Sequence, residues 1–336
     1  MTAHLLARES RKALPDVPGL ESYWSRYTRR SPPGDGSAWM ADRILLDVLG
    51  LGIEQAHEYL RSDPDFESFR DWIVATAGRP DRERLERYAA WLAGAEMPER
   101  TAWRIRSIDE APPVLDPADL EAWARDGYVV LRRAISREQA AAAASALWKH
   151  IGASPDDPDS WYRVEHKATM IQLFQQEALE PARRSPRVHK AFAQLWGTAD
   201  LWATTDRMGF NPPERPGRPF AGAPMHWDVS LATPLPFATQ AVLYLTDTEA
   251  EQGALRLVPG FHRRIESWIA ALPPGAGPRE QDLSREARAI GAEAGDLIIW
   301  RQDLPHGASP NRSARPRLVQ YVNMYAPTEE RQPDWI

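Results

Sequence analysis

A histidine and an aspartate stand two residues apart in the stretch PMHWDVS, residues 224–230. Apolar and polar residues alternate around them, which is typical of a β-strand. Residues i and i+2 of a strand project from the same face, so His226 and Asp228 would point to one side. Burying a carboxylate and an imidazole is costly unless they are paired or bind a metal ion. The pair is therefore a candidate metal-binding element, although a His-x-Asp pattern alone is weak evidence.

A second histidine of interest, His306, lies in GDLIIWRQDLPHG, where a predicted strand is followed by a turn. If His306 joined the pair, two imidazoles and one carboxylate would occupy one face of a metal ion. That arrangement leaves open coordination positions and is typical of non-haem Fe(II) oxygenases. The sequence alone does not show that the three residues meet. Surface positions are expected for His4, His57, His150 and His189, while His262 follows a strand at a turn.

Arg317 stands eleven residues after His306, at the start of the alternating stretch RLVQYVNMY. A guanidinium group is a rigid planar fork that suits a carboxylate. A buried arginine beside a metal would therefore indicate an anionic ligand. The alternative is an ordinary surface arginine, since NRSARPR contains three of them.

The composition restricts the class of protein. The chain has 336 residues, of which 43% are hydrophobic and 26% charged, and this is typical of soluble globular proteins. Its net charge of -6 does not favour nucleic-acid binding, and no apolar run approaches the roughly 18 residues of a membrane helix. The absence of cysteine excludes disulfides, thiolate zinc sites and a cysteine nucleophile, and it fits a cytoplasmic protein. Any metal must be held by nitrogen and oxygen ligands.

The first 110 residues read as helical. Residues 37–62 are strongly apolar, and Asp63-Pro64 is expected to cap and begin the next helix. The proline-rich stretch EAPPVLDP, residues 110–117, then separates two regions: a helical region, 1–110, and a core domain, 111–336. In the second region Asp116-Pro117 begins a helix, and Ser136 with Gln139 forms a capping box for an alanine-rich helix.

From about residue 160 the pattern changes to short segments separated by turn residues. A strand is expected in each of seven ranges: 170–174, 201–210, 225–231, 240–247, 253–260, 295–300 and 317–326. One further strand is expected earlier in the chain, at residues 127–136. Many short strands after a helical start indicate an α+β protein with a double-sheet jelly roll and flanking helices.

Several of these stretches together resemble the phytanoyl-CoA hydroxylase-like family of Fe(II)/2-oxoglutarate-dependent dioxygenases. The resemblance covers about residues 117–327 and depends on MHWDVS, on QGALRLVPGFHRR, on GDLIIWRQDLPHGASPNRSARPRL and on RDGYVVLRRAIS. It implies a double-stranded β-helix, a cupin-like jelly roll. It also implies that His226, Asp228 and His306 hold iron and are the catalytic set, and that Arg317 binds the distal carboxylate of 2-oxoglutarate.

The stretch MIQLF resembles the part of the family in which a polar side chain helps to bind the cosubstrate. Met170 stands where some members have lysine, so this chain departs from the family there. The cofactor-binding candidates beside Arg317 are Gln172 and Tyr244, and weaker pocket candidates are Asp206, Arg207 and Gln240. The helical region, residues 1–110, matches no part of the family core.

The resemblance implies an oxidoreductase that uses Fe(II), 2-oxoglutarate and O2 to hydroxylate a small molecule, with release of succinate and CO2. Desaturation or cyclisation with the same cofactors stays open. A jelly-roll metal-dependent isomerase or hydrolase is the alternative from another class, and Arg317 argues against it. A non-catalytic binding protein is disfavoured by the complete set of ligands. The expected partner is a small-molecule substrate, with no nucleic acid or membrane, and a homodimer is left open.

The helical region contains most of six early tryptophans: Trp24, Trp39, Trp72, Trp91, Trp103 and Trp123. Large aromatic side chains at helical spacing are usually buried, and short helices need a surface to pack on. We therefore expect residues 1–110 to pack on the core domain. Their deletion should then give an insoluble or destabilised protein, whereas a soluble and fully active truncation would contradict this packing.

Overall fold

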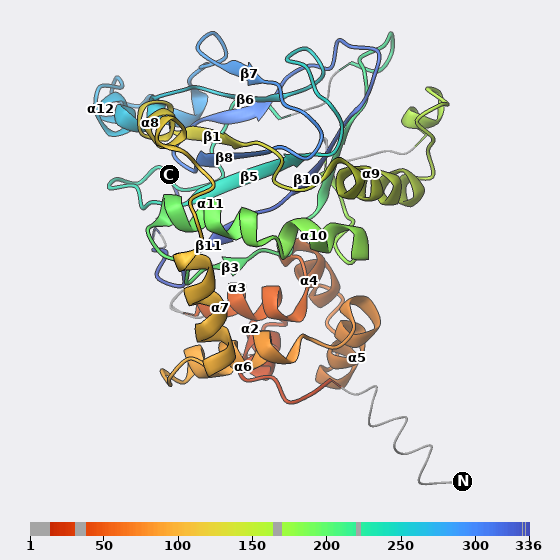
Figure 1. Cartoon of the computed structure of the whole chain (residues 1–336), viewed down its shortest axis with the longest axis vertical. Coiled ribbons are helices and arrows are strands. Elements are labelled where there is room, and N and C mark those ends of the chain that lie inside the picture. The colour runs from red at the N-terminus through yellow and green to blue at the C-terminus, as the bar shows by residue number, and fades with distance from the viewer. Residues whose placement is uncertain (1–13, 31–37, 164–169, 220–222, 331, 333) are drawn as a thin grey trace. The chain divides into compact units, whose positions relative to one another are not determined.

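A computed structural model describes residues 14–30, 38–163, 170–219, 223–330, 332 and 334–336. The chain divides into two compact units, Met1–Glu110 and Ala111–Ile336 (Figure 1). His4 lies outside the described residues. The packing of the first unit on the second stays a prediction.

The described part of the first unit is helical. Its helices are α2 (Leu20–Tyr27), α3 (Trp39–Leu49), α4 (Ile53–Leu60), α5 (Phe66–Ala77), α6 (Arg82–Leu92) and α7 (Glu99–Glu110). The apolar stretch 37–62 forms two helices because Gly50 adopts a left-handed conformation and ends α3. The expected cap at Asp63 was wrong: Asp65 caps α5 and accepts a hydrogen bond from Ser68 N at 2.7 Å.

The aromatic residues of this unit are buried differently from the expectation. Its fully buried rings are Tyr23, Phe69 and Tyr88, and Trp103 is 64% exposed. Trp72 instead stacks on Tyr59 with a ring-centroid separation of 4.3 Å. The expectation that aromatic side chains at helical spacing are buried was therefore wrong for Trp103, and Trp72 makes a ring contact that the sequence did not predict.

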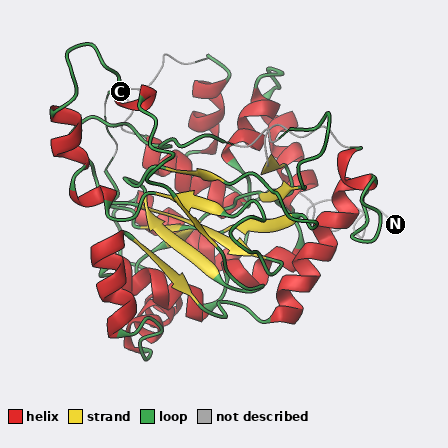
Figure 2. Cartoon of the chain, turned by 90° about the horizontal axis from the view of Figure 1, so that it is seen from above, coloured by secondary structure: helices red, strands yellow, loops and turns green. Residues whose placement is uncertain are grey.

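The second unit combines antiparallel sheets with helices. Its six-stranded sheet has the order β1-β8-β5-β10-β4-β2, and a three-stranded sheet has the order β7-β6-β9. The strands of the large sheet are β1 (Tyr128–Leu131), β2 (Met170–Ile171), β4 (Met208–Asn211), β5 (Thr239–Tyr244), β8 (Leu297–Arg301) and β10 (Arg317–Tyr321). The small sheet contains β6 (Leu255–Leu257), β7 (Arg288–Ile290) and β9 (His306–Ala308), while β3 (Trp202–Ala203) pairs with β11 (Met324–Tyr325). Figure 2 shows these strands in yellow.

Helices cover one face of the large sheet. They include α9 (Arg137–Ile151), α10 (Glu180–Arg183) and α11 (Pro186–Trp196). The helix α8 (Pro117–Asp126) precedes β1, and α12 (Ile265–Ala270) follows β6. The predicted capping box forms at Ser136, at the start of α9. The helix α8 begins at the predicted Asp116-Pro117, where Asp116 and Asp119 also form a capping box. Leucine, isoleucine and alanine side chains of the strands pack with α9 and α11 into one apolar core. Figure 1 shows α9 and α11 on one side of the large sheet and β6 and β7 on the other.

The opposite face of the large sheet packs against the small sheet. Val242, Ile298 and Val319 of the large sheet share an apolar cluster with Leu255 and Ile290 of the small one. Strand alternation therefore gives each strand of the large sheet one side chain toward the helices and the next toward the second sheet.

The expected strand over residues 225–231 was wrong. His226 makes a single bridge to His306, in which each backbone N–H donates to the other residue's carbonyl, at 2.9 and 3.0 Å. Beyond this bridge, the backbone carbonyls that would accept hydrogen bonds from a neighbouring strand accept them from a side chain. Arg279 donates to the backbone oxygens of Trp227 and Val229. The segment is thus held by a side chain where a ladder was expected.

The structure also contains elements that the sequence did not indicate. β7 and β9 are short strands of the small sheet, and β9 begins at His306 itself. Among the described residues, no helix has both the length and the apolar character needed to cross a membrane.

Candidate metal centre

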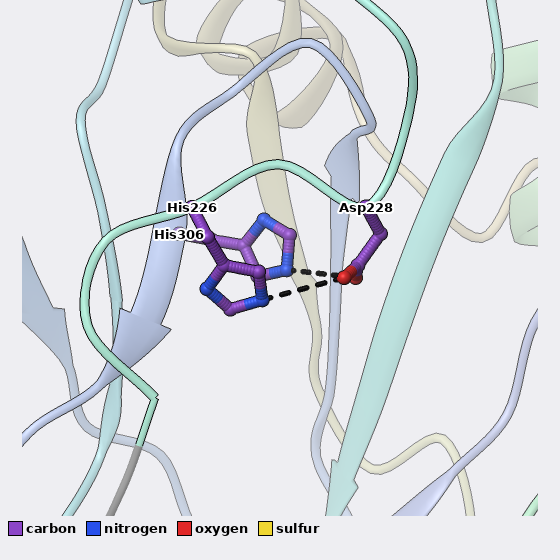
Figure 3. A group of neighbouring side chains, drawn as sticks. All are labelled: His226, Asp228 and His306. Carbon is purple, nitrogen blue, oxygen red and sulfur yellow. Dashed lines mark ion pairs between the residues drawn. The ribbon is translucent and has the colours of Figure 1, made fainter. Parts of the chain in front are cut away.

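Three predicted ligand residues meet at one point between the sheets. His226 Nε2 lies 3.3 Å from Asp228 Oδ1, and His306 Nε2 lies 3.2 Å from Asp228 Oδ2. One nitrogen or oxygen atom from each residue lies within 4.8 Å of the others. Figure 3 shows both imidazole rings directed at the carboxylate. The structure therefore brings together residues that are 80 positions apart in the sequence.

Backbone carbonyls fix the protonation of both imidazoles on the far side. His226 Nδ1 contacts the carbonyl oxygen of Pro224 at 2.7 Å, and His306 Nδ1 contacts that of Leu304 at 3.3 Å. A carbonyl only accepts hydrogen bonds, so each Nδ1 carries the hydrogen. The neutral ring then presents a lone pair at Nε2. Both lone pairs face the carboxylate oxygens of Asp228, and this concentration of acceptors needs a cation among them.

The charges of the three side chains are coupled. Burial alone would raise the pKa of Asp228. When His226 and His306 also carry a proton at Nε2, their hydrogen bonds and positive charges outweigh burial and hold this pKa well below its usual value. The hydrogen bond to Asp228 raises the pKa of His226, against the opposing effect of burial. Without a metal, a proton stabilises the cluster, so a metal ion would compete with protons for the same lone pairs.

The carboxylate of Asp228 has a further partner. Gln240 Nε2 donates to Asp228 Oδ2 at 2.6 Å, and Trp300 Nε1 donates to Gln240 Oε1 at 3.1 Å. Gln240 and Trp300 are Cα partners on β5 and β8. The ring of Trp300 also lies beside His306, with centroids 5.2 Å apart. Gln240 was only a weaker pocket candidate in the sequence, and the contribution of Trp300 was missed.

Arg317 begins β10 and is 3% exposed. Of the three arginines in NRSARPR, Arg312 and Arg315 are exposed and Arg317 is buried, which decides against the surface alternative. Among the described residues, no acceptor lies within hydrogen-bonding distance of Arg317 Nε. A buried guanidinium with an unused donor is a site for an anion.

The two other cofactor-binding candidates have different environments. Tyr244 is fully buried, its hydroxyl donates to Ile290 O at 2.8 Å, and it accepts from Leu255 N at 2.9 Å. Burial raises the pKa of this hydroxyl, and the Arg317 guanidinium opposes that shift. Gln172 directly follows β2 and is exposed. A direct role of either residue in cosubstrate binding stays a prediction.

The remaining histidines serve other contacts. His189 was expected at the surface, and this was wrong. It is 8% exposed, and its Nε2 contacts Ala199 O at 2.9 Å. The position of α11 against the apolar core buries it. His150 is exposed, whereas His57 is half-buried and stacks on Tyr27. His262 contacts Ala124 O at 3.2 Å and links the turn after β6 to α8.

Arg279 was missed from the sequence. It lies in the short helix Pro278–Glu280, and its guanidinium donates to the carbonyls on either side of Asp228. It also stacks on Trp335 near the last described residues. No local pattern marks it, because its role arises from a contact between segments about 50 residues apart.

The arrangement fits the groups that the sequence resemblance implies. Two imidazole nitrogens and a carboxylate form the donor set expected for a non-haem Fe(II) site. The orphaned Nε of the buried Arg317 fits the carboxylate of a 2-oxo acid. The two features have opposite requirements: the ligand cluster suits a cation, and the Arg317 guanidinium suits an anion.

A family model for phytanoyl-CoA dioxygenase matches residues 123–319, which is more than half of the chain. The chain belongs to the phytanoyl-CoA dioxygenase family. It is accordingly an Fe/2-oxoglutarate-dependent dioxygenase, an oxidoreductase. The matched range contains every ligand candidate and Arg317.

Individual members of the phytanoyl-CoA dioxygenase family are distant from this chain. A putative phytanoyl-CoA dioxygenase of Dictyostelium discoideum is 25% identical over 92 residues, which is 26% of each protein. An ectoine dioxygenase of Bordetella parapertussis is 24% identical over 282 residues, covering 74% of this chain and 86% of the relative. The solved structure of the α-ketoglutarate-dependent carbocyclase SnoK is 19% identical, covers 66% of this chain and 90% of that one, and has a TM-score of 0.46. A TM-score of 0.46 is too low to support a conclusion about this chain.

Proposed function

We propose that this dioxygenase hydroxylates a small molecule, with conversion of 2-oxoglutarate and O2 to succinate and CO2. The observation that supports this proposal is the convergence of His226, Asp228 and His306. In both imidazoles Nδ1 is occupied by a carbonyl, and Nε2 is left for a metal.

The proposal includes a fold assignment. The six-stranded and three-stranded antiparallel sheets share one apolar cluster, and the ligands lie where a loop and β9 meet beside it. We propose that the two sheets form a double-stranded β-helix, with the ligand set inside it.

The residues have distinct proposed roles. His226, Asp228 and His306 hold Fe(II), and Arg317 forms a charge-assisted pair with the distal carboxylate of 2-oxoglutarate. When bound, iron would activate O2, which is the oxidant: 2-oxoglutarate would supply two of the four electrons and take one oxygen atom as succinate, and the C–H bond of the substrate would supply the other two and take the second atom. Tyr244 ties two of the three strands of the small sheet, β6 and β7, to β5 beside Arg317 and so keeps the guanidinium in place. Trp300 packs beside His306 and shields it from water.

The test is a turnover assay on the purified full-length chain with Fe(II), 2-oxoglutarate and O2. A panel of small molecules is added, including ectoine, because an ectoine dioxygenase is among the matched relatives. Succinate release should depend on one panel member, and that compound should gain one oxygen atom by mass spectrometry. Loss of two hydrogens would indicate desaturation or cyclisation. Turnover that needs zinc or manganese but neither 2-oxoglutarate nor O2 would contradict the proposal and support an isomerase or hydrolase.

A further inference from the structure

Asp228 is the least constrained of the three ligand residues by its backbone. His226 and His306 bridge each other through their main chains, whereas Asp228 lies beyond that bridge in a bend. Its side chain is 51% exposed, compared with 8% for that of His306. Unlike the two imidazoles, which each have a carbonyl behind them, this carboxylate depends on other side chains for its orientation.

The side-chain amide of Gln240 can orient the Asp228 carboxylate in only one of its two flipped arrangements. The indole of Trp300 can donate but cannot accept, and an ionised carboxylate can accept but cannot donate. A side chain between them must therefore accept on one side and donate on the other, as a primary amide does. The partners fix Oε1 toward Trp300 Nε1 and Nε2 toward Asp228 Oδ2. A turned amide would place its oxygen against the carboxylate.

We propose that Gln240, oriented by Trp300, is a positioning residue that holds Asp228 for metal binding through one oxygen. The amide engages Oδ2, which also lies 3.2 Å from His306 Nε2. Oδ1, 3.3 Å from His226 Nε2, receives no hydrogen bond from the amide and is the oxygen left for the metal. A carboxylate can bind a metal through one or two oxygens. Restriction to one oxygen keeps positions open for the cosubstrate and O2. This inference rests on the proposed metal site. It states that the hydrogen bond from Gln240 on β5 controls how Asp228 binds the metal there.

The experiment measures Mn(II) affinity of the purified full-length protein, without cosubstrate, by electron paramagnetic resonance of free Mn(II). Gln240→Leu removes the donor at similar volume, and Trp300→Phe removes the indole N–H but keeps a ring beside His306. Loss of an outer hydrogen-bond partner typically weakens metal binding about 10- to 100-fold. We expect a weakening in that range for Q240L and a smaller one for W300F.

Trp196→Phe is the matched control. Trp196 Nε1 donates to Thr239 Oγ1 at 3.1 Å, so the same substitution removes an indole hydrogen bond to the residue next to Gln240. Thr239 points away from the ligands, so W196F should bind Mn(II) like the wild type. In the Q240L background, W300F should add no further loss, because the indole then has no amide to orient.

The outcomes separate this inference from the proposed function. If the wild type fails to bind Mn(II), the metal site itself is wrong. If the wild type binds and Q240L binds equally well, Gln240 does not position Asp228. If the losses of Q240L and W300F add fully, Trp300 acts through packing and the relay is wrong. Melting temperatures measured without metal identify an unfolded variant, and if Q240L does not fold, an undiminished affinity of W300F overturns the proposal.

Discussion

The two faces of the large sheet use neighbouring residues of the same strands for opposite purposes. On β10, Leu318 packs among the helices, while the adjacent Arg317 points to the other side with an unused donor. On β5, Leu243 joins the helix-covered core, while Gln240 binds a ligand carboxylate. The helix-covered face is mainly apolar, with Gln320 as a buried polar exception that donates to Leu179 O. The other face carries the ligand set and the unused donor of Arg317.

This difference separates stability from chemistry along a single strand. Apolar contacts on the first face supply folding free energy that is independent of any ligand. Polar groups on the second face are tolerated because they are held in pairs or aimed at a missing partner, and such violations of simple patterning are typical of functional sites. Substitutions on the two faces should therefore have different measurable consequences.

The largest effect is expected from the removal of one ligand. His306→Ala leaves two side chains to hold the metal, so metal binding and turnover should be lost while the fold is retained. His189→Ala is the matched control, since His189 is a buried histidine on α11 whose Nε2 contacts a carbonyl. Mn(II) titration should show no binding to H306A and unchanged affinity in H189A. Full activity of H306A would refute the ligand assignment.

The next largest effect is expected at Arg317. Arg317→Ala should raise the concentration of 2-oxoglutarate needed for half-maximal turnover and leave metal affinity almost unchanged. Truncation of a buried charge pair costs about 2–5 kcal/mol, which corresponds to roughly 30-fold to several thousand-fold. Turnover kinetics at varied concentrations of 2-oxoglutarate measure the first quantity, and the Mn(II) titration measures the metal affinity. An unchanged requirement would show that another group binds the distal carboxylate, although Arg312 and Arg315 are exposed.

The predictability of the site from the sequence depended on the kind of contact. His226, Asp228, His306 and Arg317 were found because a family resemblance fixed their types and spacing. The local reason given for the first pair was wrong, since residues 225–231 do not form the expected strand. The Arg279 guanidinium that holds this segment comes from a distant part of the chain. Such a contact leaves no periodic trace in one sequence.

The fold shows the same limit. The ranges around β1, β5, β8 and β10 were predicted because these central strands combine apolar alternation with turn residues at their ends. The three-residue strands β7 and β9 were missed. Segments of that length carry too little periodicity, and their conformation is decided by pairing with β6. The cap of α5 is a further case: Asp65 caps the helix in place of the expected Asp63, and the two aspartates are separated only by Pro64.

A substitution on the helix-covered face should affect stability alone. Leu243 is fully buried in that core. Leu243→Ala should lower the free energy of unfolding by about 2–5 kcal/mol, through lost burial and the cavity left behind. Mn(II) affinity per folded molecule should stay at the wild-type value. Denaturant titration measures the first quantity. A large loss of metal affinity in folded L243A would show that the two faces are coupled more tightly than their side-chain contacts indicate.

The smallest effect concerns His262, whose ring is hydrogen-bonded to a backbone carbonyl and not to a carboxylate. Burial lowers the pKa of His262 from 6.5, and the nearby Arg301 adds to this shift, whereas Asp228 raises the pKa of His226. Above pH 6.5 His262 is neutral in both the folded and the unfolded state, so its contribution to stability is complete. As the pH falls below 6.5, the unfolded state takes up the proton first, and this contribution is progressively lost.

His262→Gln keeps a side chain that can donate to Ala124 O but cannot titrate. The melting temperature of this variant, measured without metal, should therefore fall less steeply between pH 6.5 and about 5 than that of the wild type. The difference in slope is the contribution of a single titrating group. His150→Gln is the control, because His150 is exposed and its removal should leave the slope unchanged. A slope that is as steep in H262Q as in the wild type would show that other groups carry the acid sensitivity. Burial without a hydrogen bond to a carboxylate would then not be what distinguishes His262 from the histidines of the ligand set.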